Sequence, residues 1–143
     1  MKVAVVGLDD EYVAEFAKNL AEVFNIQYIN FDDELCEKIV MLRNTKLEQM
    51  LYVLEQTEKE LLSSCLSEKN FVISVKNSTF ISNANYKYFK NVLTICIEKD
   101  SNEKTFKNIQ NLIKKHCKIK INQEKIDINE VKNEILNYFN ENK

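Results

Sequence analysis

Five short apolar segments alternate along the chain with stretches in which apolar residues recur at helical spacing. These segments cover residues 2–7, 26–30, 71–75, 92–97 and 118–122. After Lys2 the first segment is apolar and rich in β-branched residues, which is typical of a strand buried on both faces of a parallel sheet. The last alternates polar with apolar residues, so we expect it to be a half-exposed edge strand.

Apolar side chains at helical spacing predict helices between and after these strands, over residues 13–24, 35–42, 47–65, 106–113 and 131–139. A short helical turn is expected over 83–90. Polar residues with capping potential precede three of the helices: Asp9 or Asp10, Ser101, and Asp127 with Glu130. Strands that alternate with helices indicate a parallel sheet covered on both faces. The pattern therefore predicts an α/β fold of three layers, α/β/α, with a five-stranded parallel sheet in a single domain spanning residues 1–143.

Composition narrows the classes of function. The 20 basic and 22 acidic residues give a net charge of -2, whereas a nucleic-acid-binding domain normally carries a basic face. No apolar run approaches the roughly 18 residues of a membrane span, and MKVAVVGLDDE does not read as a signal peptide. We therefore expect a cytoplasmic protein with no nucleic-acid and no membrane partner. With one glycine in the chain, a glycine-rich phosphate loop is excluded.

Metal and disulfide chemistry have little support. The chain has one histidine, His116, and no CxxC pair among its four cysteines, Cys36, Cys65, Cys96 and Cys117. Buried, reduced thiols are the expected state of these cysteines. His116 follows two lysines near the end of a predicted helix, where positive charge complements the helix dipole.

Polar residues follow the predicted strands, and ligands bind beyond the carboxyl ends of strands in open parallel sheets. The candidate ligand-binding residues there are Asp9, Asp10, Asn30, Asp32, Lys76, Asn77 and Ser78. Four carboxylates, with Asp33 as the fourth beside Asp9, Asp10 and Asp32, could converge on a divalent cation. Capping of the helices that begin here accounts for the same residues, and we expect no metal. Lys76 is expected to pair with Asp10 or Asp32.

The order of elements resembles that of the shikimate kinases, small P-loop kinases that phosphorylate shikimate with ATP and magnesium. VAVVGLDDEYVAEFAKNLAEVFNIQYINFDDELCEKI, residues 3–39, follows that family's strand, phosphate loop, helix, strand and acidic turn. LEQMLYVLE at 47–55 falls where the family has Gly-Glu-x-x-Phe-Arg-x-x-Glu, and FVISVKNSTF at 71–80 falls where a strand leads into a glycine triplet. CKIKINQEKIDINEVKNEIL at 117–136 is similar to the closing strand and helix. The resemblance implies a P-loop kinase topology.

The phosphate loop of that family is missing here. Counting from Gly7, the positions of its second glycine, lysine and hydroxyl hold Tyr12, Val13 and Ala14. These are the groups that wrap and neutralise the phosphates and bind magnesium. Asp9, Asp10 and Glu11 also add negative charge where a triphosphate would lie.

The substrate side of the family's site is reduced as well. Asn30 and Asp32 stand at the Asp-x-Asp pair, and Tyr52 replaces the substrate-binding arginine. Residues 76–78, Lys-Asn-Ser, replace the glycine triplet, and residues 98–118 leave no room for the arginine-rich lid. Only Asp32 survives as a vestigial candidate, so we expect no catalytic residues.

VAVVGLDDE, residues 3–11, also resembles the opening of a response-regulator receiver domain. In that family an acidic pair holds magnesium beside a phosphorylatable aspartate at the end of the third strand. This chain has Lys76 and Asn77 there, and residues 31–70 exceed the receiver's spacing between its second and third strands. Strand order separates the two families: the first strand lies between the third and fourth in kinases, and between the second and third in receivers.

The favoured hypothesis is a catalytically inactive shikimate kinase-like protein that acts as a binding or regulatory module. A protein partner or a homo-oligomer is expected, and no cofactor. One alternative is a nucleotide- or small-molecule-binding enzyme with an atypical site built from Asp9, Asp10, Asp32, Lys76 and Ser78. ATP and magnesium are expected only under that alternative. The other alternative is a pseudo-receiver signalling domain.

Overall fold

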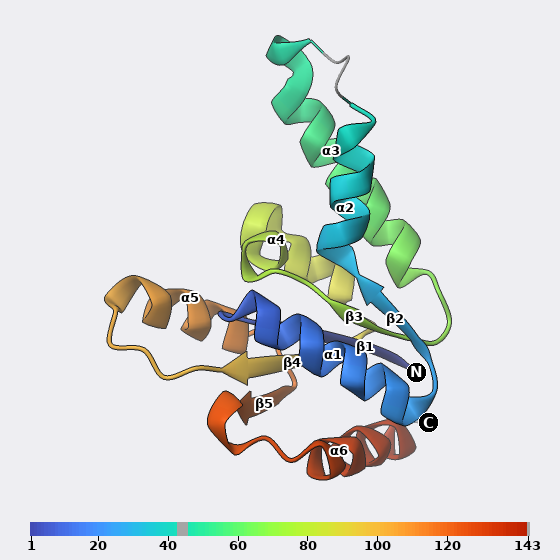
Figure 1. The fold of residues 1–143 in the computed structure, drawn as a ribbon, viewed down its shortest axis with the longest axis vertical. Coiled ribbons are helices and arrows are strands. Elements are labelled where there is room, and N and C mark those ends of the chain that lie inside the picture. Colours follow the sequence, from blue (N-terminus) through green and yellow to red (C-terminus); the bar gives the residue numbers. More distant parts are fainter. Residues whose placement is uncertain (43–45, 143) are drawn as a thin grey trace.

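The computed structural model describes residues 1–42 and 46–142 (Figure 1). Five parallel strands form one sheet in the order β2-β3-β1-β4-β5. The strands are β1 (Lys2–Gly7), β2 (Gln27–Asn30), β3 (Phe71–Ser74), β4 (Leu93–Glu98) and β5 (Ile119–Asn122). All five predicted strands are therefore confirmed, and β5 is an edge strand as expected.

The helices alternate with these strands. They are α1 (Asp10–Phe24), α2 (Phe31–Val40), α3 (Leu47–Leu66), α4 (Asn77–Ile81), α5 (Lys104–Lys114) and α6 (Ile128–Glu141), with 3-10 turns η1 (Ser82–Phe89) and η2 (Gln123–Lys125). The sequence pattern did not predict α4, because five residues are too few to show helical periodicity. None of the helices in the described ranges is long and apolar enough to cross a bilayer.

Both faces of the sheet are covered, which confirms the three-layer arrangement. Side chains alternate along β1, so that Val3 and Val5 face one layer while Ala4 and Val6 face the other. The first layer contains α1 and α6 and packs Phe16, Leu20, Val131 and Ile135 on the sheet. The second contains α3, α4 and α5 and packs Leu62, Leu66, Phe80 and Ile113 on the sheet.

The strand order decides between the two resemblances. β1 lies between β3 and β4, pairing Val3 with Val72 on one side and with Leu93 on the other. This is the order expected for a kinase-type sheet. A receiver requires the first strand beside the second, so the pseudo-receiver hypothesis is wrong about the fold.

Helix α2 and the first half of α3 form an arm that projects away from the sheet (Figure 1). We use "the arm" for residues 31–42 and 48–58. Within the described part of α3, the fully buried side chains are Leu62 and Leu66, both in its last two turns. The sheet-facing end of α3 is therefore anchored in the core, and its other end is not.

Some local expectations need correction. Ser101 accepts a hydrogen bond from the Glu103 N–H but does not cap α5, which begins at Lys104. Asp127 does cap α6, although its carboxylate bonds the Asn129 N–H rather than forming the expected pair with Glu130. The apolar residues at helical spacing over 131–139 include Leu136, which is exposed rather than buried.

Candidate functional site

A cavity of about 420 Å³ opens at the carboxyl ends of β2 and β3, beside the first turns of α1. It is lined by Asp10, Glu11, Val13, Ala14, Asn30, Asp32, Ser74, Val75 and Lys76. Four of the seven predicted ligand-binding residues thus come together there: Asp10, Asn30, Asp32 and Lys76. This is the position at which open parallel sheets bind ligands.

Acidic side chains outnumber basic ones on the wall of this cavity. Lys76 Nζ lies 3.3 Å from Asp32 Oδ2, which confirms the predicted ion pair. Burial raises the pKa of the Asp10 carboxyl and the Asp32 charge raises it further, while Lys76 lowers it. With Glu11 also on the wall, three carboxylates face one lysine. The cavity therefore favours a neutral or cationic ligand over an anionic one.

The sequence reasoning missed Ser74 on this wall. Ser74 is buried at the end of β3, and its hydroxyl lies 2.8 Å from the Tyr28 hydroxyl of β2. A serine inside an otherwise apolar strand was the available signal, because a buried hydroxyl requires a polar partner.

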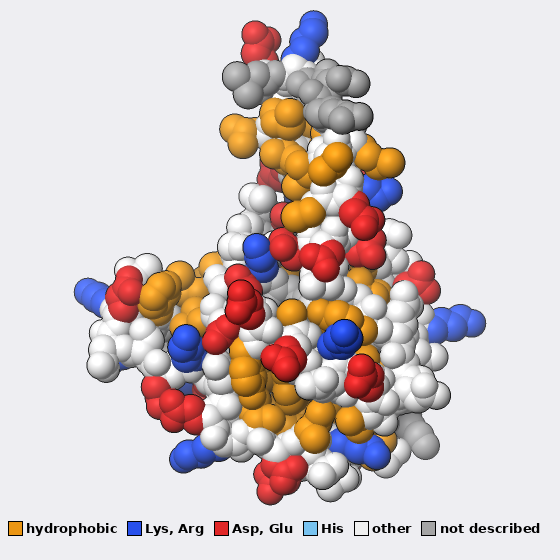
Figure 2. Space-filling view, in the orientation of Figure 1, with side chains coloured by type: hydrophobic (Ala, Val, Ile, Leu, Met, Phe, Trp, Pro, Cys, Tyr) orange, Lys and Arg blue, Asp and Glu red, His pale blue; other side chains and the backbone are white. Residues whose placement is uncertain are grey.

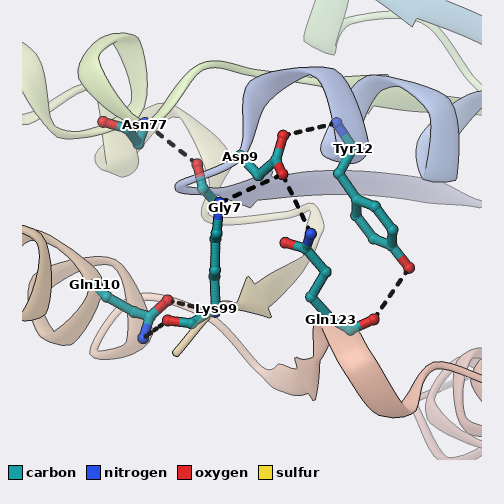
Figure 3. Close-up of polar contacts among 7 residues, drawn as sticks. All are labelled: Gly7, Asp9, Tyr12, Asn77, Lys99, Gln110 and Gln123. Carbon is teal, nitrogen blue, oxygen red and sulfur yellow. Dashed lines mark hydrogen bonds and ion pairs between the residues drawn. The ribbon is translucent and has the colours of Figure 1, made fainter. Parts of the chain in front are cut away.

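Asp9 belongs to a different cluster, on the other side of the β1 end (Figure 3). Its Oδ1 accepts the Tyr12 N–H at 3.1 Å, which makes it the N-cap of α1. Its Oδ2 accepts Gln123 Nε2 at 3.2 Å and lies 3.7 Å from Lys99 Nζ. The backbone N–H of Tyr12 lowers the pKa of Asp9 most, followed by Gln123 and with help from Lys99. Asp9 is therefore a stabilised anion at the start of α1.

The partners of Asp9 are themselves held in place (Figure 3). The Gln110 side chain bridges Lys99, accepting its backbone N–H at 2.8 Å and donating to its carbonyl at 3.1 Å. The Tyr12 hydroxyl donates to the Gln123 carbonyl at 3.3 Å. The carboxyl ends of β1, β4 and β5 are thus joined by one polar network. The sequence did not predict this network, because its members lie far apart along the chain.

The remaining predicted residues do not line the cavity. Asn77 Nδ2 donates to the Gly7 carbonyl at 3.3 Å, and Ser78 is exposed on α4. Asp9, Asp10, Asp32 and Asp33, which could have converged on a cation, do not do so, because Asp9 turns toward Lys99. Within residues 1–42 and 46–142, no three His, Cys, Asp or Glu side chains are placed to hold a metal. Asn30 caps α2 by accepting the Asp33 N–H.

The cysteines and the histidine also lie outside the cavity. All four cysteines are free; Cys96 and Cys117 are buried, but Cys36 is exposed, so the expectation of buried thiols is wrong there. His116 lies beyond the end of α5 and stacks on Tyr86 at a ring distance of 3.7 Å. The structure therefore gives His116 a packing role rather than a place in the last turn of a helix.

Lys76→Met is expected to lower the free energy of unfolding by about 0.5 kcal/mol at neutral pH. The pair with Asp32 is more than one-third exposed, so solvent screens much of its energy. The loss should shrink in acid, because burial raises the pKa of the Asp10 carboxyl, which then becomes neutral and no longer needs a cation. Urea unfolding at both pH values measures it. Lys90→Met, which changes an exposed lysine outside the described ion pairs, is the control, and equal stability of the two variants would contradict the role of Lys76.

Comparison with known proteins gives the fold. No family model and no curated protein matches the sequence. Among solved structures, shikimate kinase from Aquifex aeolicus is 22% identical with a TM-score of 0.66, over 99% of this chain and 98% of that one. Shikimate kinase from Acinetobacter baumannii in complex with shikimate is 11% identical with a TM-score of 0.69, over 100% and 95% of the two chains. The chain thus has the fold of shikimate kinases over its whole length.

Proposed function

We propose that this chain is a cytoplasmic, catalytically inactive protein of the shikimate kinase fold, which acts as a binding or regulatory module without a nucleotide cofactor. The observation that carries the proposal is the position of Asp9. Its carboxylate caps the first helix after β1, where a P-loop kinase holds the phosphates of its nucleotide. The protein's own anion thus takes the place of the ligand's.

Electrostatics and packing both support this proposal. Two unit charges about 4 Å apart repel by about 4 kcal/mol at an effective dielectric of 20, so the Asp9 carboxylate opposes a phosphate at this helix end. Val13 stands where the family has its phosphate-binding lysine, and its side chain is buried against the sheet. The residues present therefore do not fit ATP and magnesium.

The second candidate function is a small-molecule-binding protein, and the 420 Å³ cavity favours it. Asp10, Asp32 and Lys76 offer acceptors and a donor to a neutral or cationic ligand. This candidate keeps the atypical site of the sequence analysis, but without Asp9 and Ser78. It differs from the first because it requires a small-molecule ligand, which enters the cavity beside α1 and β2.

ATP, ADP and GTP, with or without magnesium, are expected to leave the thermal unfolding midpoint unchanged at millimolar concentration. A ligand at 100 times its dissociation constant would stabilise the protein by about 2.7 kcal/mol, which moves the midpoint by several degrees. Differential scanning fluorimetry of the whole chain measures this shift. An active shikimate kinase carried through the same titration is the positive control.

A clear nucleotide shift would contradict the inactive assignment. If that shift survived in Lys76→Met and was lost in Lys99→Met, the nucleotide would lie over the β4 end despite Asp9. A shift with small diamines or polyols, lost in Asp32→Asn, would instead support the small-molecule candidate.

A further inference from the structure

The end of the arm carries the large apolar side chains with the highest exposed fractions among the described residues. They come from two runs of consecutive apolar residues, Ile-Val-Met-Leu at 39–42 and Met-Leu-Tyr-Val-Leu at 50–54. Leu51 is 83% exposed and Met41 77%, with Tyr52, Val40 and Ile39 next among the arm's exposed residues. We call these five residues the arm patch. Figure 2 shows hydrophobic side chains gathered on this part of the arm.

The patch is not an ordinary scatter of exposed apolar residues. A helix that is apolar on all sides is normally buried, and runs of exposed apolar residues are avoided unless they have a function. Single exposed residues need no explanation, but contiguous patches mark interaction sites. The arm projects from the sheet, so the protein's own layers do not cover its end (Figure 1).

We propose that the arm patch is a dimerisation surface, on which the arm of a second copy of this chain packs. The two helices of one arm are bare on more than one side. Two such hairpins related by a twofold axis cover one another as a four-helix bundle, which is a closed arrangement. Because the same patch faces itself, apolar side chains meet apolar side chains in both copies.

The area of the patch fits this occupant. A fully exposed large side chain offers on the order of 150–200 Å², so the patch presents about 600 Å² per copy and about 1,200 Å² in a dimer. That total reaches the lower end of specific, stable interfaces. The dimer is therefore expected to be reversible rather than obligate.

The charges beside the patch argue against a lipid surface. The described arm residues include seven carboxylates and one lysine, and Glu37 and Glu48 are exposed close to the patch in sequence. Anionic lipids repel such a surface, and a bilayer would have to bury its carboxylates. A second copy leaves them at the rim of the interface, in water.

Sedimentation velocity of the whole chain, from micromolar to several hundred micromolar, tests the dimer. The mass should rise with concentration from 16.8 kDa toward twice that value. Leu51→Glu should weaken dimerisation by about 30-fold, the equivalent of about 2 kcal/mol for a central interface residue. Because Leu51 is exposed in the single chain, the variant should keep the wild-type circular dichroism spectrum and midpoint.

Phe106→Glu is the matched control, because Phe106 is 46% exposed on α5, outside the arm. It should dimerise as the wild type does. A wild type that stays monomeric throughout, or a Leu51→Glu variant that dimerises equally well, would overturn the proposal. So would a monomer that floats with phosphatidylcholine vesicles and loses this binding in Leu51→Glu. The nucleotide titration reports on the strand ends alone, so either proposal can fail without the other.

Discussion

Gly7→Val is expected to lower the free energy of unfolding by about 3 kcal/mol, because the chain has no room for a side chain at this position. A Cβ atom at Gly7 would lie 2.7 Å from the carbonyl oxygen of Ile97 and 3.0 Å from Val13 Cγ2. The first contact is with the backbone of β4, which pairs with β1 at this point. Overpacking of this kind typically costs about 1–3 kcal/mol, and Val adds two methyl groups to the clash. Urea unfolding of both proteins measures the loss.

Gly7→Ala gives the graded control. It should lose less than Gly7→Val, since only the Cβ must be accommodated. If the alanine variant were more stable than the wild type, as a strand position with free space allows, β4 would have to move away without cost and the packing argument would fail. The single glycine of the chain thus has a structural explanation in which no phosphate takes part.

Asn85→Ala is expected to lower the free energy of unfolding by about 2 kcal/mol. Asn85 is completely buried, and its amide donates to the Thr79 carbonyl at 2.8 Å and to the Glu58 carboxylate. These bonds tie α4 and η1 to Glu58, the arm residue of α3 that lies nearest in sequence to the anchored end. The alanine variant leaves both acceptors without this donor, and each unsatisfied buried group costs about 1–3 kcal/mol. Chemical denaturation gives the loss.

Ala84→Gly, one residue away, should have the opposite sign. Ala84 adopts a φ of 56°, in the left-handed region that costs an L-residue about 1–2 kcal/mol. Glycine relieves this strain, but its more flexible unfolded chain lowers the free energy of unfolding by about 0.5–1 kcal/mol. The net change should therefore be a small gain in stability. A loss in both variants would mean that the turn tolerates no change, and the Asn85 effect could not be assigned to its hydrogen bonds.

The layered sheet could be predicted from sequence because its signals are local. Residues 2–7 and 71–75 are apolar runs whose burial on both faces follows from their composition, and 118–122 alternates as an edge strand does. The α4–η1 segment could not be predicted in the same way. Asn83 and Ala84 both have positive φ there. The segment is held by the buried amide of Asn85, which bonds Glu58 of α3, a residue far from it in sequence.

The candidate site was predictable in part for the same reason. The pairing of Lys76 with Asp32 follows from two neighbouring strand ends, which the strand pattern already implies. Asp9 was expected beside Asp10, but adjacent residues at a helix start point in different directions. Its partners Lys99 and Gln123 come from strand ends about 90 and 110 residues further along the chain, beyond the reach of local pattern rules.

The central place of β1 has a consequence for synthesis. β1 is made first, yet its neighbours in the sheet begin at Phe71 and Leu93. During translation the segment Val3–Val6 therefore waits for its first strand partner, β3, until about half of residues 1–143 have been made, and for its second, β4, until about two-thirds have been made. Such late, non-local pairing slows folding. It also leaves an apolar, β-branched segment exposed, so that it can pair with strands of other nascent chains. Asp9 and Asp10 follow this segment, and their negative charges oppose its aggregation with other chains.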